Sequence, residues 1–372
     1  MMQKLLHKIA DSPNTIKALS SIVAIIAGLL VGLVVMLIAN PGQAFPGFLT
    51  ILAGGFNRGL RSMGDMFYYG APIVLTGLSV AFAFRTGLFN IGATGQLTVG
   101  AFFALYIGYN WTFLGPIHWI VALLGGAIAG AIWGAIPGLL KAFRNVHEVV
   151  ASIMLNYVAM YLVKILIIST IYNSGSNEAH SPAPSARLPM FFLDTIFPER
   201  SSINGGILIT ILVVIIIHIV LNKTTFGYEL KSVGHNRHAS RYAGMNEKRN
   251  IVLSMTIAGA LSGLAGGILF LVGDKNLDPV NTLLQEGFTG IAIALLGLAS
   301  PIGVFFAGVF YGSLELGGYY LQTFDFEPQI IDVIIAVIIY FAALALFFQR
   351  FVADWIGKMI EKDVEIVEGS ET

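Results

Sequence analysis

The sequence predicts an all-α integral membrane protein with about ten transmembrane helices and both termini in the cytoplasm. Of its 372 residues, 56% are hydrophobic and 11% are charged, whereas about 25% are charged in an ordinary soluble domain. Long apolar segments recur along the chain, and a helix needs roughly 20 apolar residues to cross about 30 Å of hydrocarbon. Lys and Arg gather in alternate loops, as the positive-inside rule expects of cytoplasmic loops.

The composition also excludes several classes of protein. The chain has 21 basic and 21 acidic residues, so it lacks the basic excess of a nucleic-acid binder. It has no cysteine, which excludes disulfide scaffolds, thiolate metal sites and cysteine nucleophiles. His235 and His238 alone are a poor metal site, because no carboxylate or thiolate accompanies them in the pattern.

Ten segments are predicted to cross the membrane, and two of them are short or interrupted. The first is too long for the apolar part of a signal peptide. The ten segments are about 19–39, 67–84, 88–108, 117–140, 149–171, 204–221, 251–272, 286–298, 302–322 and 330–348. The short or interrupted ones are 67–84 and 286–298, and the Gly-rich segment 45–66 is expected at the membrane interface.

The loops set the predicted orientation and domain organisation. With the N-terminus inside, 15 of the 21 Lys and Arg residues are cytoplasmic, 5 are external and Lys164 lies within a span. The largest external loop is 172–203, the largest cytoplasmic loop is 222–250, and a cytoplasmic tail follows from 349 to 372. Residues 1–372 are therefore predicted to form a single transmembrane domain. Five spans on each side of the external loop permit an inverted five-plus-five repeat with interrupted helices.

Two spans carry glycines at helical spacing. Gly126, Gly130 and Gly134 share one face of the fourth span, and Gly259 and Gly263 share one face of the seventh. Small residues at this spacing let another helix backbone approach closely. The pattern predicts helix packing, either within the subunit or at a subunit interface.

Polar side chains at membrane depth mark candidate pathway residues. They are Asn90, Thr94 and Gln96 at the start of the third span, Asn156 and Tyr157 in the fifth, and Glu315 in the ninth. Such residues are costly in lipid and usually face a cavity or another helix. The alternatives are structural, because amides can bond the backbone of a broken helix and Glu315 can be a hydrogen-bonded packing acid.

No ATPase motif is present. The only Gly-Lys pair, Gly357-Lys358, is followed by Met359 and not by the Ser or Thr of a phosphate-binding loop. Neither a nucleophile elbow nor a dinucleotide-binding glycine pattern occurs. Energy from ATP would therefore come from another polypeptide.

The cytoplasmic loop carries a candidate docking element. Arg237 to Gly244 can form two short helical turns, which Gly244 ends. The segment is basic and carries Tyr242, so it suits a groove on a partner protein. The alternative is a solvated loop that is basic only because it lies in the cytoplasm.

These residues resemble the permease subunits of ABC importers, in the group of ribose and branched-chain amino-acid permeases. The loop resembles their coupling segment, here Gly234, Asn236, Arg237, Ala239, Arg241, Tyr242 and Gly244. Further similarity lies in Phe89-Asn90-Ile91-Gly92-Ala93-Thr94-Gly95-Gln96, in residues 148–157 and in residues 287–303. The Asn-Ile-Gly and Met-Leu-Asn-Tyr elements are most similar to bacterial nucleoside (guanosine or purine nucleoside) permeases. The resemblance covers about residues 65–345.

The resemblance implies a multi-pass permease subunit of the bacterial plasma membrane that imports nucleosides by alternating access. It implies no cofactor in this chain, with ATP and Mg bound by a partner ATPase. It also implies a second permease subunit, expected to be a different chain, and an extracellular substrate-binding lipoprotein. The alternatives are a permease for a sugar or a branched-chain amino acid, an ion-coupled secondary transporter, and a membrane scaffold without transport activity.

Overall fold

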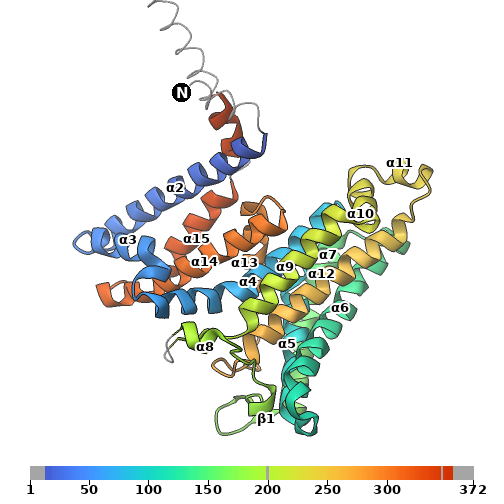
Figure 1. Ribbon diagram of the computed structural model, residues 1–372, viewed down its shortest axis with the longest axis horizontal. Coiled ribbons are helices and arrows are strands. Elements are labelled where there is room, and N and C mark those ends of the chain that lie inside the picture. Colours follow the sequence, from blue (N-terminus) through green and yellow to red (C-terminus); the bar gives the residue numbers. More distant parts are fainter. Residues whose placement is uncertain (1–12, 198–200, 345–346, 355–372) are drawn as a thin grey trace, which may run out of the picture. The chain divides into compact units, whose positions relative to one another are not determined.

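The computed structural model describes residues 13–197, 201–344 and 347–354. These residues are mainly α-helical, and the strands among them are the short antiparallel pair β1 (Tyr172–Asn173) and β2 (Glu178–Ala179) (Figure 1). The chain divides into two compact units, one of Met1–Leu52 with Gly317–Thr372 and one of Ala53–Leu316. The second unit contains most of the candidate functional residues.

The first unit is built from an N-terminal and a C-terminal segment of the chain. Its helices are α2 (Pro13–Ala39), α3 (Ala44–Ala53), the last residues of α14 (Pro301–Leu321), η4 (Gln322–Phe324) and α15 (Pro328–Ala343). α2 packs against α15, and a Cβ on Gly28 would lie 2.7 Å from the carbonyl oxygen of Ile338. The buried side chains Met36, Ile51 and Leu321 belong to its core.

The second unit is a bundle of long helices with short connecting elements. Its long helices are α4 (Leu60–Arg85), α5 (Ala93–Asn110), α6 (His118–Arg144), α7 (Glu148–Thr170), α9 (Gly206–Lys223), α12 (Glu247–Phe270), α13 (Gln285–Leu296) and most of α14. The shorter elements are η1 (Gly54–Phe56), η2 (Thr112–Ile117), η3 (Pro184–Ala186), α8 (Leu193–Ile196), α10 (Thr225–His235) and α11 (Arg237–Tyr242).

α12 lies at the centre of this bundle and packs against α4, α5 and α6. The glycines of α6 and α12 make the close approach possible, since a Cβ on Gly130 would lie 2.7 Å from the Cα of Gly263. A Cβ on Gly134 would lie 2.9 Å from the Cα of Gly259, and Gly126 also faces the backbone of Gly263. The glycine faces therefore meet each other inside one subunit, where backbone contact replaces side-chain packing.

Seven of the described helices are long and apolar enough to cross a membrane. They are Leu19–Ala39, Leu60–Arg85, Thr112–Arg144, Glu148–Thr170, Gly206–Lys223, Glu247–Phe270 and Pro301–Phe324. Three shorter apolar helices cover Ala44–Phe56, Gln285–Leu296 and Gln329–Phe341. α5 is not among these helices, because polar residues in its first turns and at its end make it less apolar than they are. Most of its side chains are buried in the bundle.

The structure changes two predicted boundaries. The segment 67–84 was expected to be short or interrupted, but it belongs to α4, which is a continuous helix of 26 residues despite Pro72. The segment 45–66 is divided among α3, η1 and the first turns of α4, and its place at the membrane interface stays a prediction. The short helix expected over 286–298 is confirmed as α13, which has 12 residues.

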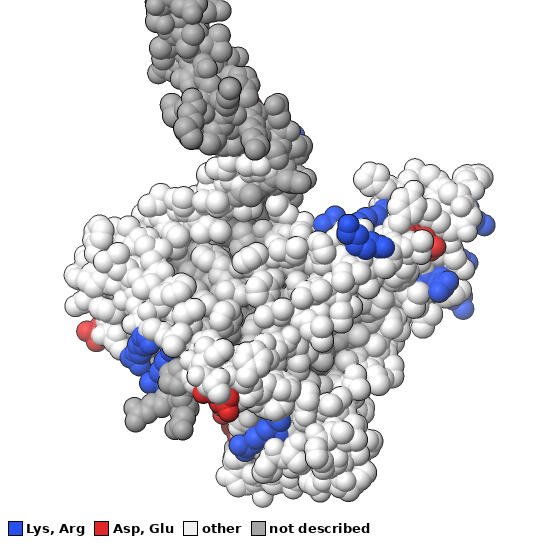
Figure 2. Space-filling model, viewed as in Figure 1, with Lys and Arg blue, Asp and Glu red and all other residues white. Residues whose placement is uncertain are grey.

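The loops predicted to lie on opposite sides of the membrane are at opposite ends of the second unit. α10 and α11 lie at one end and the β1–β2 hairpin lies at the other (Figure 1). Figure 2 shows Lys and Arg side chains over the end formed by α10 and α11, and mixed charges at the other end. Uncharged surface predominates between them on the face drawn, as expected for a segment in contact with lipid.

Candidate functional site

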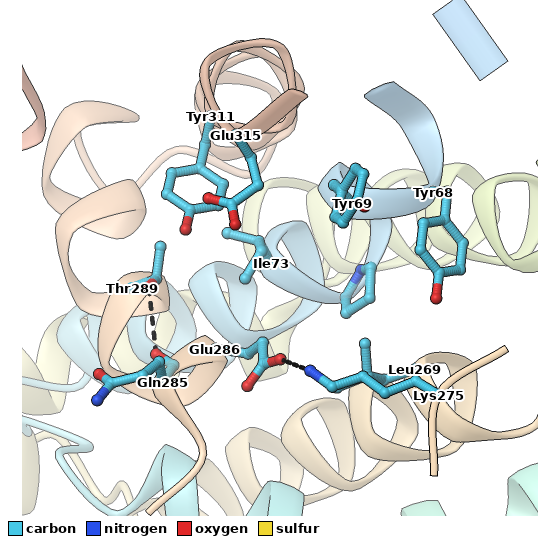
Figure 3. A pocket seen from close by; sticks show the side chains of 11 residues that line it. Tyr68, Tyr69, Ile73, Leu269, Lys275, Gln285, Glu286, Thr289, Tyr311 and Glu315 are labelled. Atoms are coloured by element: carbon cyan, nitrogen blue, oxygen red, sulfur yellow. Dashed lines mark hydrogen bonds and ion pairs between the residues drawn. The ribbon is translucent and has the colours of Figure 1, made fainter. Parts of the chain in front are cut away.

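A cavity of ≈ 150 Å³ lies within the second unit, between α4, α13 and α14 (Figure 3). Eleven residues line it: Tyr68, Tyr69, Pro72, Ile73, Leu269, Lys275, Gln285, Glu286, Thr289, Tyr311 and Glu315. Its volume is below the roughly 300–1,000 Å³ of sites that enclose a drug-sized ligand. The cavity is therefore a narrow passage or a partly closed site.

Its polar groups are arranged in two sets. The Tyr311 hydroxyl donates a hydrogen bond to the Glu315 carboxylate, one helical turn further along α14. Across the cavity, Lys275 Nζ lies 2.8 Å from Glu286 Oε1 (Figure 3). Lys275 also lines a second cavity of ≈ 120 Å³, so this ion pair stands where the two cavities approach each other.

The backbone of α13 is held in place by its two neighbours. The Thr76 hydroxyl of α4 donates to the Glu286 carbonyl oxygen over 2.9 Å. Gly290 packs on Thr76, where a Cβ would lie 2.7 Å from the Thr76 Cβ, and Gly287 packs on Thr94 of α5. These contacts place the polar first turn of α13 at the cavity, because neither glycine position has room for a side chain.

The arrangement suits a neutral polar ligand with an aromatic part. Tyr68 and Tyr69 offer ring surfaces, with centroids 5.2 Å apart in an edge-to-face arrangement. Carboxylates accept hydrogen bonds while tyrosine, threonine and lysine donate them. No group of three or more His, Cys, Asp or Glu residues that could hold a metal ion occurs among the described residues.

Of the predicted pathway residues, Glu315 lines this cavity. Tyr157 lies elsewhere, on α7, with 51% of its surface exposed. Asn90, Thr94, Gln96 and Asn156 are buried between helices and are not among the residues that line the cavity. Of the six predicted pathway residues, Glu315 alone is among the described residues that line this cavity.

The amides of Asn90 and Gln96 bond each other. Asn90 Nδ2 donates to Gln96 Oε1 over 2.8 Å, and Gln96 Nε2 donates to Asn90 Oδ1 over 2.9 Å. Asn90 Nδ2 also donates to Ser79 Oγ over 2.9 Å. This pair joins the irregular segment before α5 to the first turn of α5 and to α4, and both amide side chains are satisfied without a ligand.

Asn156 connects α7 to the same segment. Its Oδ1 accepts from the Gly95 backbone N–H over 2.9 Å, and its Nδ2 donates to the Ile91 carbonyl oxygen over 3.0 Å. α5 begins only at Ala93, so these backbone groups lie at a helix terminus that lacks some of its own partners. The Asn156 amide supplies them.

Apart from Glu315, the residues that line the cavity were not predicted from the sequence. Tyr311 could have been found, because it precedes Glu315 by four residues and so shares its helix face. Tyr68, Tyr69 and Lys275 had no such signal, since aromatic residues are common in apolar spans and Lys275 lies in a loop. Gln285 and Glu286 stand at the polar start of a short apolar segment, which does not by itself indicate a cavity.

The predicted coupling segment forms two short helices. Asn236 caps α11, and its Oδ1 accepts from the Ala239 backbone N–H over 3.0 Å. Gly244 follows α11 with φ +83°, which confirms that a glycine in the left-handed region ends the helix. Tyr242 is 95% exposed at the end of α11, with Arg237 and Arg241 on the same short helix.

Gly234 ties this segment to the bundle. A Cβ on Gly234 would lie 2.5 Å from the Arg85 carbonyl oxygen and 2.9 Å from the Gly87 backbone nitrogen. The contact places α10 against the end of α4, and burial together with the Arg85 charge lowers the pKa of Lys231 on α10. This contact joins α10 to α4, the helix that carries Tyr68 and Tyr69.

Residues 62–343 match the protein family described as "Branched-chain amino acid transport system / permease component". The guanosine ABC transporter permease protein NupP of Bacillus subtilis is 39% identical over 350 residues, which cover 92% of this chain and 96% of that protein. The nucleoside ABC transporter permease protein NupB of Lactococcus lactis is 33% identical, with 89% and 92% covered. The glucose ABC transporter permease protein TsgB13 of Haloferax volcanii is 30% identical, with 75% of each chain covered. No solved structure matches the chain.

Apolar helices, an internal polar cavity and these comparisons together define a multi-pass permease subunit of the bacterial plasma membrane. The chain belongs to the branched-chain amino acid transport system permease family. Permeases of ABC importers work with an ATPase and a substrate-binding protein, so the ion-coupled and scaffold alternatives do not hold.

Proposed function

We propose that this chain is the permease subunit through which an ATP-driven importer moves nucleosides into the cell. The likeness to nucleoside permeases over nearly the whole chain carries the proposal. The cavity supports it, because tyrosine rings can stack on a nucleobase, an interaction worth roughly 1–3 kcal/mol per base in known sites. Carboxylate and hydroxyl groups nearby can bond the polar edges of the base and the ribose.

The path runs through the cavity of Tyr68, Glu286, Tyr311 and Glu315, and it binds its substrate weakly. An importer that receives substrate from a binding protein gains nothing from a tight site along the way. The small volume of ≈ 150 Å³ agrees with a path that opens and closes during transport. Asn90, Gln96 and Asn156 have a structural role in this proposal, because they already bond one another or the backbone.

The chain lies in the membrane with both termini and the segment 222–250 in the cytoplasm. The gathering of Lys and Arg at the end formed by α10 and α11 supports this orientation (Figure 2). α10 and α11 dock on a partner ATPase, with Tyr242 as the apolar contact. ATP and Mg are bound by that ATPase, since this sequence has no phosphate-binding loop.

The importer also contains a second permease subunit of different sequence and a substrate-binding lipoprotein outside the cell. One experiment tests the assembly: purify the tagged chain from its native membrane and identify the proteins that accompany it. An ATPase, a second permease and a lipoprotein are expected. Their absence from an intact, monodisperse preparation would contradict the assembly.

A sugar is the second candidate substrate, because a glucose permease is also among the relatives. Uptake of labelled guanosine should be competed by other nucleosides and not by glucose, ribose or branched-chain amino acids. The reverse order of competition would replace the nucleoside assignment and leave the permease assignment intact.

The docking assignment has its own test. Tyr242→Ala should lower ATPase co-purification and uptake together, because it removes an aromatic side chain of α11 that is 95% exposed. Tyr161→Ala, which changes an exposed tyrosine of α7 outside the docking segment, is the matched control. Unchanged co-purification in Tyr242→Ala would place the ATPase contact elsewhere.

A further inference from the structure

A groove of ≈ 380 Å³ lies between the end of α6 and the start of α12, away from the polar cavity. Leu139 and Phe143 of α6 and Val252 and Leu253 of α12 form its apolar surface. Lys248 and Arg249 stand beside it on the first turn of α12. The groove therefore combines an apolar floor with a cationic rim.

The apolar floor is open. Phe143 is 62% exposed and Leu139 is 45% exposed. Both lie in the last turns of a helix that is long and apolar enough to span a membrane, and Val252 lies near the start of another. The groove is thus at the depth where acyl chains meet lipid headgroups, and lipid can reach it from the side.

The rim is positively charged. Lys248 Nζ lies 5.3 Å from the centre of the Phe143 ring, and Lys248 and Arg249 are both exposed. Among the residues that the structure describes, those lining the groove include no Asp or Glu.

We propose that this groove binds one anionic phospholipid, with an acyl chain against Phe143 and Leu139 and the phosphate between Lys248 and Arg249. Basic pockets at the ends of membrane helices recognise lipid headgroups in this way. Lys and Arg side chains also place their charges at the headgroup level while their stems lie on apolar surface. This ligand is separate from the transported substrate, and the assignment does not depend on which substrate that is.

The test compares two lipids that share acyl chains and differ in charge, phosphatidylglycerol and phosphatidylcholine. The full-length chain, purified with its accompanying subunits in detergent, is titrated with each lipid, and bound lipid is counted by native mass spectrometry. Phosphatidylglycerol should bind roughly thirtyfold more tightly, since each of the two basic residues near the headgroup adds about 1 kcal/mol.

Lys248→Glu with Arg249→Glu should abolish this preference. Lys223→Glu with Lys231→Glu is the matched control, because it makes the same charge change outside the groove and should keep the preference. Phe143→Ala with Leu139→Ala should weaken both lipids and leave their ratio unchanged. If the charge-reversed pair does not give a monodisperse protein, Lys248→Gln with Arg249→Gln replaces it.

Three results would overturn the assignment. Equal binding of the two lipids by the unmodified protein would remove the headgroup preference. An equal loss in the control pair would show that only total charge matters. A photo-crosslinker at position 143 that captures a protein subunit and no lipid would make the groove a subunit interface.

Discussion

Two polar regions inside the second unit look alike in the sequence and differ in the structure. The amide cluster, defined as Asn90, Gln96 and Asn156, is almost completely buried, and its amides are bonded to each other, to Ser79 or to the backbone. The acidic cavity, defined by Glu286, Tyr311 and Glu315, is partly open and adjoins empty volume. Polar residues at membrane depth thus occur in two different environments, one buried and hydrogen-bonded and one beside a cavity.

The two regions differ in the free energy that is lost when one of their polar groups has no hydrogen-bond partner. A buried polar group without a partner costs about 1–3 kcal/mol, so a satisfied cluster resists any motion that separates its members. Groups that line a cavity can exchange partners with water or a ligand at little cost. We therefore expect substitutions in the amide cluster to change stability and substitutions in the acidic cavity to change transport.

The largest effect is expected for Asn90→Leu. It leaves the Gln96 amide and the Ser79 hydroxyl without Asn90 in a buried site, at a cost on the order of 3 kcal/mol. The yield of folded protein after size-exclusion chromatography should fall steeply, and the thermal midpoint should fall with it. The double variant Asn90→Leu with Gln96→Leu should be milder than Asn90→Leu alone, because removing both partners leaves fewer unpaired groups. Normal yield with lost uptake would return Asn90 to the transport path.

Asn156→Leu should have the next largest effect. It removes the partners of the Gly95 N–H and the Ile91 carbonyl oxygen, which should cost about 2 kcal/mol. The adjacent change Tyr157→Leu is the control, because an exposed substitution usually stays within about 0.5 kcal/mol. Thermal unfolding in the same detergent compares the two variants. If Tyr157→Leu lowers uptake and keeps stability, Tyr157 belongs to the path as the sequence predicted.

The sequence predicts contacts between residues of one regular helix better than contacts that depend on an irregular segment. The helical bundle follows from the apolar segments, and the contact of Tyr311 with Glu315 follows from a spacing of four residues on one helix. The pairing of Asn90 with Gln96 does not, because residues 88–92 leave the helix and form a turn that brings the two amides together. The pair of Lys275 and Glu286 also depends on a loop, the segment between α12 and α13, whose course no periodicity indicates.

Glu315→Gln should leave stability nearly unchanged and lower uptake by roughly tenfold, which corresponds to about 1.4 kcal/mol of lost interaction along the path. The amide keeps the size of the side chain and removes its charge and one acceptor position. Uptake per molecule inserted in the membrane is the measurement, with Phe306→Leu on an exposed part of α14 as control. A loss of folded protein equal to that of Asn90→Leu would make Glu315 a packing acid and remove the contrast between the two regions.

The smallest effect is expected for the ion pair of Lys275 and Glu286. Lys275 has 46% of its side chain exposed, so breaking the pair should cost less than about 1 kcal/mol of stability. Its position beside both cavities nevertheless predicts a two- to threefold change in uptake (a step of roughly 0.5 kcal/mol) in Lys275→Met and in Glu286→Gln. A double-mutant cycle separates the contributions, because a pair that acts as a unit makes the double variant no worse than either single one. Fully additive losses would mean that the two charges act independently on the path.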